Sequence, residues 1–183
     1  MIVQSPPIFY IHGYQSSPDG AKGALFSQTL QARALKYRDV PPEYLVINES
    51  LERIKKDINS FNEVVLIGSS LGGLLASVTA LNTSNVARLF LLNPAIMPPG
   101  TDIDVINSMP KRILTDMYFP KLFSKKISSE IIIFRGTKDE VVSDEWVLPF
   151  AQFQEASVYF LSDDHRFSTR IYDIVKIIQK HLD

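Results

Sequence analysis

The feature that most restricts the fold of this chain is a series of short, mostly apolar runs along the sequence. The clearest run is Val64–Ile67, and comparable ones occupy Ile8–Ile11, Ala87–Leu92, Glu130–Phe134 and Ser157–Leu161. Short runs of aliphatic, β-branched and aromatic residues are typical of strands buried on both faces. Because longer stretches separate the runs, the pattern predicts a parallel sheet whose strands are joined by helices.

The stretches between these runs have the periodicity of helices. Apolar residues recur at helical spacing, which predicts helices over about 22–35, 51–61, 74–81, 146–153 and 171–182. A weak sixth strand is expected at Tyr37–Val40, where two prolines stop it. The sequence shows no second core and no internal repeat. We therefore expect residues 1–183 to form a single α/β domain of about six strands.

One segment, at about 95–127, does not fit this alternation. It is long for a connection between a strand and a helix, so it is expected to form a lid or cap-like insertion, with a short helix between Pro110 and Pro120. Methionine and aromatic side chains can line an adaptable apolar pocket. The candidate substrate-binding residues in this segment are Met97, Met117, Tyr118 and Phe119. The alternative is that these side chains only pack the insertion onto the domain.

A turn between a predicted strand and a predicted helix carries a nucleophile motif. Gly68–Gly72 has the sequence Gly-Ser-Ser-Leu-Gly and matches G-x-S-x-G, in which the serine occupies a sharp, strained turn. The backbones two residues before and two residues after that serine approach closely. Glycines stand at both positions if Ser70 is the nucleophile. With Ser69 in that role, the positions would hold Ile67 and Leu71, whose side chains would not fit. Ser70 is therefore the expected nucleophile. Neither a phosphate loop nor a dinucleotide fingerprint is present.

The base that activates such a serine is a histidine, and it is expected late in the chain. His165 lies just after the last predicted strand, whereas His181 lies in the predicted terminal helix. Sites in open α/β sheets gather at the carboxyl ends of strands, so His165 is the expected base. Asp139 follows the preceding strand, and the chain order Ser70, Asp139, His165 is the one expected with this motif.

Other carboxylates compete with Asp139 for the role of the acid. They are Glu140, Asp144, Asp163 and Asp164. Asp144 is expected to stabilise the first turn of the helix that follows it. Asp163 and Asp164, which directly precede His165, are expected to be too close in sequence to reach back to its ring in the required orientation. Asp139 therefore remains the expected acid.

Acyl transfer also requires hydrogen-bond donors for the oxyanion that develops on the substrate. One expected donor is the backbone N–H of Leu71, which follows the nucleophile. The second is expected from the loop after the first strand, where Gly13 allows close approach and the N–H of Tyr14 is the candidate. His12 then shapes this loop and is not the base. The alternative is that Gly13 is an ordinary glycine at a strand end.

Five motifs together resemble those of the YqiA-type family of small bacterial α/β-hydrolases. They are Tyr10–Pro18, Gly68–Gly73, Asn93–Ala95, Thr137–Val141 and Asp164–Phe167. The resemblance implies a minimal α/β-hydrolase fold with helices on both faces of the sheet. It also implies esterase or thioesterase-like activity that needs no metal. The acidic pair before His165 departs from the family, in which small residues are often found there.

Composition narrows the possible partners. The 183 residues include 19 Lys and Arg and 20 Asp and Glu, a net charge of −1, so no nucleic-acid or membrane surface is indicated. The absence of cysteine excludes disulfides, thiolate catalysis and cysteine-ligated zinc, and the three histidines do not have metal-ligand spacing. The apolar runs are too short to span a bilayer, and no leader sequence is expected. We therefore expect a cytoplasmic protein without a cofactor.

These features predict a serine hydrolase that cleaves a small-molecule carboxylic ester or thioester. The acyl-enzyme would form on Ser70, with His165 as the base and Asp139 as the orienting acid. The alternative is a binding or interaction protein that has the hydrolase fold and little or no turnover.

Overall fold

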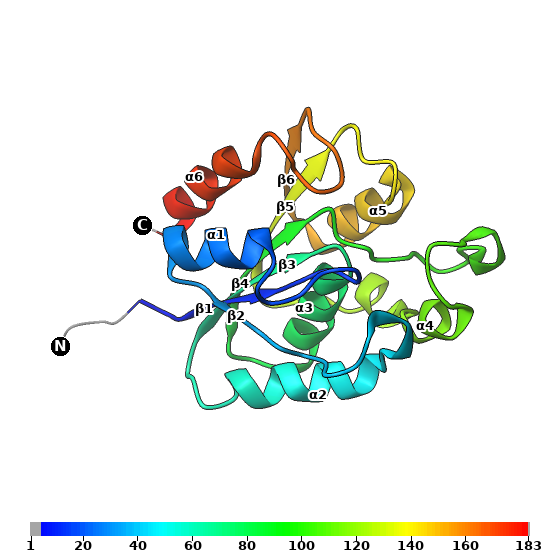
Figure 1. The fold of residues 1–183 in the computed structure, drawn as a ribbon, viewed down its shortest axis with the longest axis horizontal. Coiled ribbons are helices and arrows are strands. Elements are labelled where there is room, and N and C mark those ends of the chain that lie inside the picture. The colour runs from blue at the N-terminus through cyan, green and yellow to red at the C-terminus, as the bar shows by residue number, and fades with distance from the viewer. Residues whose placement is uncertain (1–4, 183) are drawn as a thin grey trace.

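The computed structural model describes residues 5–182, in which six parallel strands form one sheet (Figure 1). The strands are β1 (Ile8–Ile11), β2 (Arg33–Ala34), β3 (Val64–Ser69), β4 (Val86–Leu92), β5 (Glu130–Gly136) and β6 (Ser157–Leu161). Their order across the sheet is β2-β1-β3-β4-β5-β6, and every neighbouring pair is parallel. The predicted lack of a leader falls partly on residues 1–4, which lie outside the described residues.

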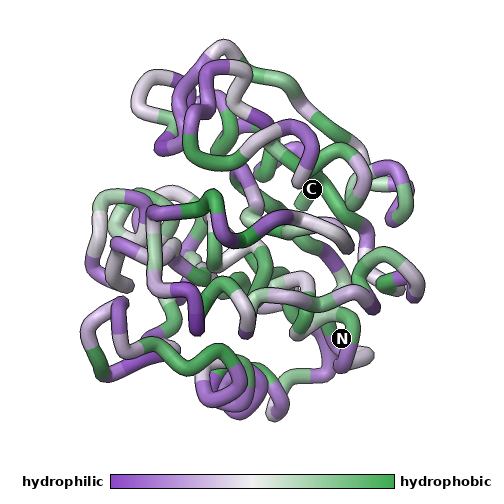
Figure 2. The backbone as a smooth tube through the Cα atoms, turned by 90° about the vertical axis from the view of Figure 1, so that its right-hand side faces the viewer, coloured by the Kyte–Doolittle hydropathy of each residue, from purple (hydrophilic) through white to green (hydrophobic). Residues whose placement is uncertain are grey.

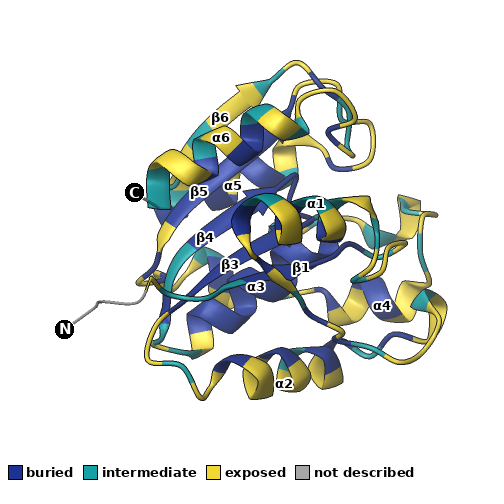
Figure 3. Ribbon diagram, turned by 60° about the vertical axis from the view of Figure 1, so that its left-hand side comes forward, coloured by how far each residue is buried: buried dark blue, intermediate teal, exposed yellow. Residues whose placement is uncertain are grey.

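Helices cover both faces of this sheet, as predicted. They are α1 (Ala21–Leu30), α2 (Ile47–Ile58), α3 (Leu71–Asn82), α4 (Lys111–Asp116), α5 (Asp144–Gln154) and α6 (Ile171–Leu182). α1 and α6 lie on one face, and α2, α3 and α5 lie on the other (Figures 1 and 3).

Alternation along the strands divides the core into two clusters. In β3, Val65 and Ile67 pack toward α1 and α6, whereas Val64 and Leu66 pack toward α2 and α3. Successive side chains of a strand point to opposite faces, so a strand covered on both faces has to be apolar throughout. α2 lies on the outside and is mostly hydrophilic, at the bottom of Figure 2. The predicted parallel sheet with helices on both faces is confirmed.

The position predicted for the second strand is wrong. β2 is Arg33–Ala34, inside the region expected to form the first helix, and not Tyr37–Val40. The helix ends at Leu30 because Gln31 adopts a left-handed conformation with φ 55° and returns its N–H to the Phe26 carbonyl. Apolar spacing continues past this point, so periodicity alone could not locate the end of the helix.

The segment between β4 and β5 forms short helices that pack on the domain. It contains η2 (Ile103–Val105), α4 and η3 (Pro120–Phe123), and α4 begins directly after Pro110 as predicted. Its apolar side chains join the same core cluster as α3 and α5. A lid function for 95–127 stays a prediction.

Candidate active site

Ser70 occupies a strained turn between β3 and α3. Its backbone has φ 55° and ψ −118°, whereas Ser69 is the last residue of the strand. A non-glycine residue in such a conformation costs on the order of 1–3 kcal/mol and persists only where its surroundings enforce it. The Ser70 N–H donates to the Leu92 carbonyl at 2.9 Å, and its carbonyl accepts from the Ala95 N–H at 3.0 Å. These bonds to the end of β4 hold the strained turn in place.

The glycines around Ser70 allow close backbone contacts. A Cβ atom on Gly68 would lie 2.5 Å from the Gly72 carbonyl oxygen, and one on Gly72 would lie 2.0 Å from the Ile11 carbonyl oxygen. A Cβ on Gly73 would lie 2.7 Å from the Cβ of Pro94. The backbones at Gly68 and Gly72 thus approach their neighbours as closely as the motif predicts when Ser70 is its serine.

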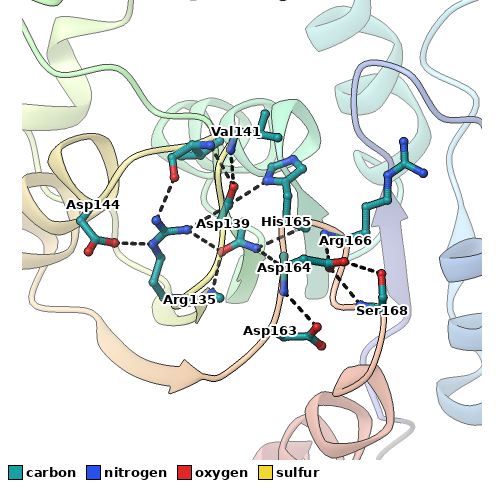
Figure 4. A network of polar contacts seen from close by, with 12 residues as sticks. Arg135, Asp139, Val141, Asp144, Asp163, Asp164, His165, Arg166 and Ser168 are labelled. Carbon is teal, nitrogen blue, oxygen red and sulfur yellow. Dashed lines mark hydrogen bonds and ion pairs between the residues drawn. The ribbon is translucent and has the colours of Figure 1, made fainter.

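His165 and Asp139 meet at the carboxyl ends of β5 and β6. His165 Nδ1 lies 2.8 Å from Asp139 Oδ2 (Figure 4). The Asp139 side chain is fully buried, while 19% of the His165 side chain is exposed. Asp139 Oδ1 accepts from the N–H groups of Val141 at 2.8 Å and Val142 at 3.0 Å. The carboxylate is therefore fixed behind the ring, with its orientation set by its own loop.

The environment of Asp139 keeps it ionised. Burial alone would raise its pKa, but the hydrogen bonds from His165 and from the Val142 and Val141 N–H groups outweigh burial and hold the pKa below its ordinary value. An ionised carboxylate can only accept hydrogen bonds, so Nδ1 of His165 carries the proton. In the neutral ring the other nitrogen, Nε2, then has a free lone pair and can act as a base.

Asp163 shapes the loop that carries His165 instead of contacting its ring. Its Oδ1 accepts from the Asp164 N–H at 2.9 Å, and its Oδ2 accepts from the N–H groups of Thr169 at 3.0 Å and Arg170 at 2.6 Å. The last two groups stand just before α6, where N–H groups lack helical partners. Burial would raise the pKa of Asp163, but these backbone bonds lower it.

Asp164 closes the same loop from its outer side. Its carboxylate accepts from the Ser168 hydroxyl at 2.6 Å and from the N–H groups of Ser168 and Arg166 at 3.1 and 2.9 Å. The Ser168 hydroxyl is the main cause of a pKa below the usual range for Asp164. The acidic pair is thus used for loop geometry, and Figure 4 shows both carboxylates turned away from the imidazole.

The loop after β1 lies directly against Ser70. A Cβ atom on Gly13 would lie 3.4 Å from Ser70 Cβ and 3.9 Å from Ser70 Oγ. Tyr14 follows Gly13, and Leu71 follows Ser70 as the first residue of α3. The roles of their N–H groups as oxyanion donors stay predictions.

His12 helps to fix that loop and is buried. Its ring stacks on Tyr37 with centroids 4.4 Å apart, and its Nδ1 lies 2.9 Å from the Gly13 carbonyl oxygen. Tyr37 Oη donates to the His12 carbonyl at 3.1 Å, and Arg38 Nη2 donates to the Ser16 carbonyl at 2.8 Å. Burial lowers the pKa of His12 to about 4, so the ring is uncharged near neutral pH.

A pocket of about 730 Å³ opens over the serine. Ser70, His165 and Tyr14 line it together, and its walls come from the first turn of α1, the His165 loop and the start of α6. A volume of this size suits a small organic ligand. Asp139 lies behind His165, outside the lining.

The predicted substrate-binding residues do not line this pocket. Met97 and Met117 are buried in the core, while Tyr118 is 49% exposed and Phe119 packs against the core from its edge. Met109, from the same segment, lines the pocket. Sequence showed an apolar insertion but could not show which of its side chains the core takes up.

Two residues of the site were not singled out from sequence. Asn93 appeared only in the Asn93–Ala95 motif of the family resemblance and Arg135 in no predicted site, yet both lie buried beside Asp139 and His165. A signal was present, because Arg135 is a charged residue at the end of an otherwise apolar run.

Within residues 5–182, no group of three or more His, Cys, Asp or Glu side chains is arranged to hold a metal ion. In the same range, no helix combines the length and apolar character required to cross a membrane. The cytoplasmic location stays a prediction.

Solved structures of low sequence identity share this fold. Est1E from Butyrivibrio proteoclasticus, solved with ferulic acid, aligns with a TM-score of 0.79 at 16% identity over 98% of this chain and 88% of Est1E. Mouse alpha/beta hydrolase domain-containing protein 10 aligns at 0.75, with 20% identity over 98% and 90% of the two chains. The Pyrococcus furiosus esterase Pf2001 aligns at 0.73, with 14% identity over 98% and 83%.

The sheet, the turn at Ser70 and these alignments define an α/β-hydrolase fold of the kind found in esterases. The model of the uncharacterised protein family UPF0227 matches residues 7–179, and the chain belongs to that family. UPF0227 is the YqiA-like family, so the resemblance seen in the sequence is confirmed. No curated protein is significantly similar in sequence to the chain.

Proposed function

We propose that this protein is a serine hydrolase that cleaves carboxylic esters or thioesters. The observation that carries the proposal is a single constellation. Ser70 stands on a strained turn and lines one pocket with His165, whose Nδ1 is bonded to the buried Asp139. Nucleophile, base and orienting acid come from three separate elements and converge at one edge of the sheet.

The proposed reaction begins when Ser70 Oγ attacks the substrate carbonyl carbon. His165 Nε2 takes the hydroxyl proton, and Asp139 stabilises the imidazolium that forms. The N–H groups of Tyr14 and Leu71 bind the oxyanion. The tetrahedral intermediate then expels the alcohol or thiol, which receives the proton from His165 and leaves an acyl-enzyme on Ser70. Water, deprotonated by His165, releases the acid and restores the hydroxyl.

The pocket favours a substrate with a negatively charged group. Lys22 and Arg166 line it, and none of its described lining residues carries a carboxylate. Burial lowers the pKa of Lys22, while the charges of Asp164 and Asp163 act to raise it; among the described residues, neither carboxylate lies at ion-pair distance from its ammonium group. We therefore propose that the substrate is an ester whose anionic group lies near Lys22 and Arg166.

A fluorophosphonate probe tests the nucleophile, because it labels only an activated serine. We expect one adduct per chain, located on Ser70 by mass spectrometry of the labelled peptide. Ser70→Ala should abolish labelling and lower ester hydrolysis by roughly 10⁶-fold. The matched control is Ser69→Ala, which should retain much of both activities. An unlabelled wild-type protein that still binds esters would favour the alternative of a binding protein, and an adduct on Ser69 would contradict the assignment.

Two matched esters test the substrate class. Phenyl butyrate and the phenyl monoester of succinic acid share a leaving group and differ in one terminal carboxylate. The kcat/KM for the succinate monoester divided by the kcat/KM for phenyl butyrate, both corrected for spontaneous hydrolysis, should fall about 2- to 5-fold in Lys22→Met and in Arg166→Met. Lys176→Met, at an exposed position of α6, is the control. Equal ratios in all variants would remove the anionic group from the proposal and leave the esterase assignment intact.

A further inference from the structure

A buried arginine lies directly behind the carboxylate of Asp139. Arg135 is near the end of β5, and only 4% of its side chain is exposed. Its guanidinium donates to Asp139 Oδ2 at 2.9 Å, Asp144 Oδ1 at 2.6 Å, Asn93 Oδ1 at 3.0 Å and the Val142 carbonyl at 2.8 Å. A buried cation is tolerated only when such partners satisfy it. The network holds Arg135 in one place (Figure 4).

Arg135 and His165 bind the same oxygen of the acid. Asp139 Oδ2 accepts from both the Arg135 guanidinium and His165 Nδ1, while Oδ1 is occupied by backbone N–H groups. The negative charge that faces the imidazole is therefore shared with a permanent positive charge. A protonated His165 gains less from this carboxylate than it would from an Asp139 without Arg135.

Asn93 ties the arginine to the loop of the base. Its Oδ1 accepts from Arg135 Nη1 and from the Gly136 N–H, and its Nδ2 donates to the His165 carbonyl at 3.1 Å. Asn93 is fully buried and has a left-handed backbone conformation with φ 42°. A Cβ on Gly136 would lie 2.8 Å from the Asp163 and Asp164 carbonyl oxygens, so the His165 loop sits tightly against this position.

We propose that Arg135, fixed by Asn93, is a positioning residue that extends the activity of His165 as a base to lower pH. The inference rests on the proposed function, because it concerns the proton transfer from Ser70. A guanidinium this close to Asp139 Oδ2 reduces the attraction that this carboxylate offers to a protonated ring, so removal of Arg135 is expected to move the acid limb of the rate profile to higher pH. The guanidinium also holds Asp139 in the orientation that selects the tautomer of His165.

Other charged side chains lie on the surrounding elements. They are Lys22, Lys138, Glu140, Glu145, Asp163, Asp164 and Arg166. Among the residues that the structure describes, none of these side chains is hydrogen-bonded to Arg135, to the Asp139 carboxylate or to the His165 ring. Asp144 is different, because it opposes the charge of Arg135 from the first turn of α5. It is 60% exposed, so its effect is screened by solvent.

The test measures the second-order rate of fluorophosphonate labelling between roughly pH 5 and 9, the range in which histidine changes charge. We expect the acid limb of the wild-type profile to move to higher pH by about one unit in Arg135→Met. Asp144→Asn should move the limb the opposite way, by less, because Arg135 then shares its charge with Asp139 alone. Arg135→Lys keeps the charge and should restore the limb toward its wild-type position.

Opposite shifts in these variants separate positioning from simple structural support. A residue that only stabilises the fold would lower the melting temperature and the labelled fraction without moving the midpoint of the limb. If Arg135→Met does not fold, Asp144→Asn and Arg135→Lys still decide the matter through their midpoints. An unmoved limb, or shifts of the same sign in Arg135→Met and Asp144→Asn, overturns the inference. A wild-type protein that is not labelled overturns the proposed function instead, and this inference with it.

Discussion

The turn at Ser70 and the corner formed by Asp139 and His165 are built in different ways. The turn depends on the backbone, since Gly68 allows the Gly72 carbonyl to approach it and Gly72 allows the Ile11 and His12 carbonyls to approach it. The corner depends on side chains, which join β4, β5 and the loop after β6 through hydrogen bonds. A change at the turn should therefore act through steric conflict, and a change at the corner through charge and orientation.

Apart from the removal of Ser70 itself, the largest expected effect comes from the corner. Asp139→Asn should keep the shape of the side chain but lose the charge that stabilises the His165 imidazolium, lowering kcat by roughly 10⁴-fold. The matched control is Asp164→Asn, which alters the outer side of the same loop and should leave kcat within a few-fold of wild type. Steady-state hydrolysis of a reactive aryl ester measures both. A collapse in Asp164→Asn with an active Asp139→Asn would mean that the His165 loop supplies its own acid.

The turn should respond to a single methyl group. Gly72→Ala places a Cβ atom 2.0 Å from the Ile11 carbonyl oxygen and 2.6 Å from that of His12, both backbone atoms that cannot rotate away. We expect a loss of about 3 kcal/mol in the free energy of unfolding, measured in urea. Gly100→Ala is the control. It has φ 88° but open space around the position, so it should lose only about 1 kcal/mol. Equal losses would show that crowding does not define the turn.

The smallest effect concerns Asp163 and depends on pH. Its folded-state pKa is lowered, so its stabilising contribution is complete above the unfolded-state pKa of about 4 and disappears as the pH falls through the folded-state value. Asp163→Asn should cost about 1 kcal/mol at neutral pH, as for a lost helix cap. The difference from wild type in the free energy of unfolding should shrink below about pH 4.

An exposed carboxylate provides the control for this pH dependence. Asp57→Asn, on the outer side of α2, should change the free energy of unfolding little at any pH. If the Asp163→Asn difference stays constant into the acid range, the bonds to the Thr169 and Arg170 N–H groups do not depend on the charge of Asp163.

Sequence reasoning succeeded where a local pattern has one physical solution. The apolar runs predicted the strands of the sheet apart from β2, and G-x-S-x-G predicted a tight turn centred on Ser70. It failed at β2, because a two-residue strand has too little sequence to carry a signal and a left-handed Gln31 ended the helix early. Met97 and Met117 were candidates for a pocket, with packing onto the domain as the alternative, and both are buried in the core.

The sequence by itself determined how strands and helices alternate along the chain, apart from β2. It also determined the strained serine and the candidates for its partners, because periodicity and glycine spacing act over a few residues. Only the tertiary structure decided that Asp139, and not Asp163 or Asp164, lies against the His165 ring. It alone placed Asn93 and Arg135 behind that pair. The physical reason is that a hydrogen bond between side chains far apart in the sequence depends on how the strands align, which no local pattern encodes.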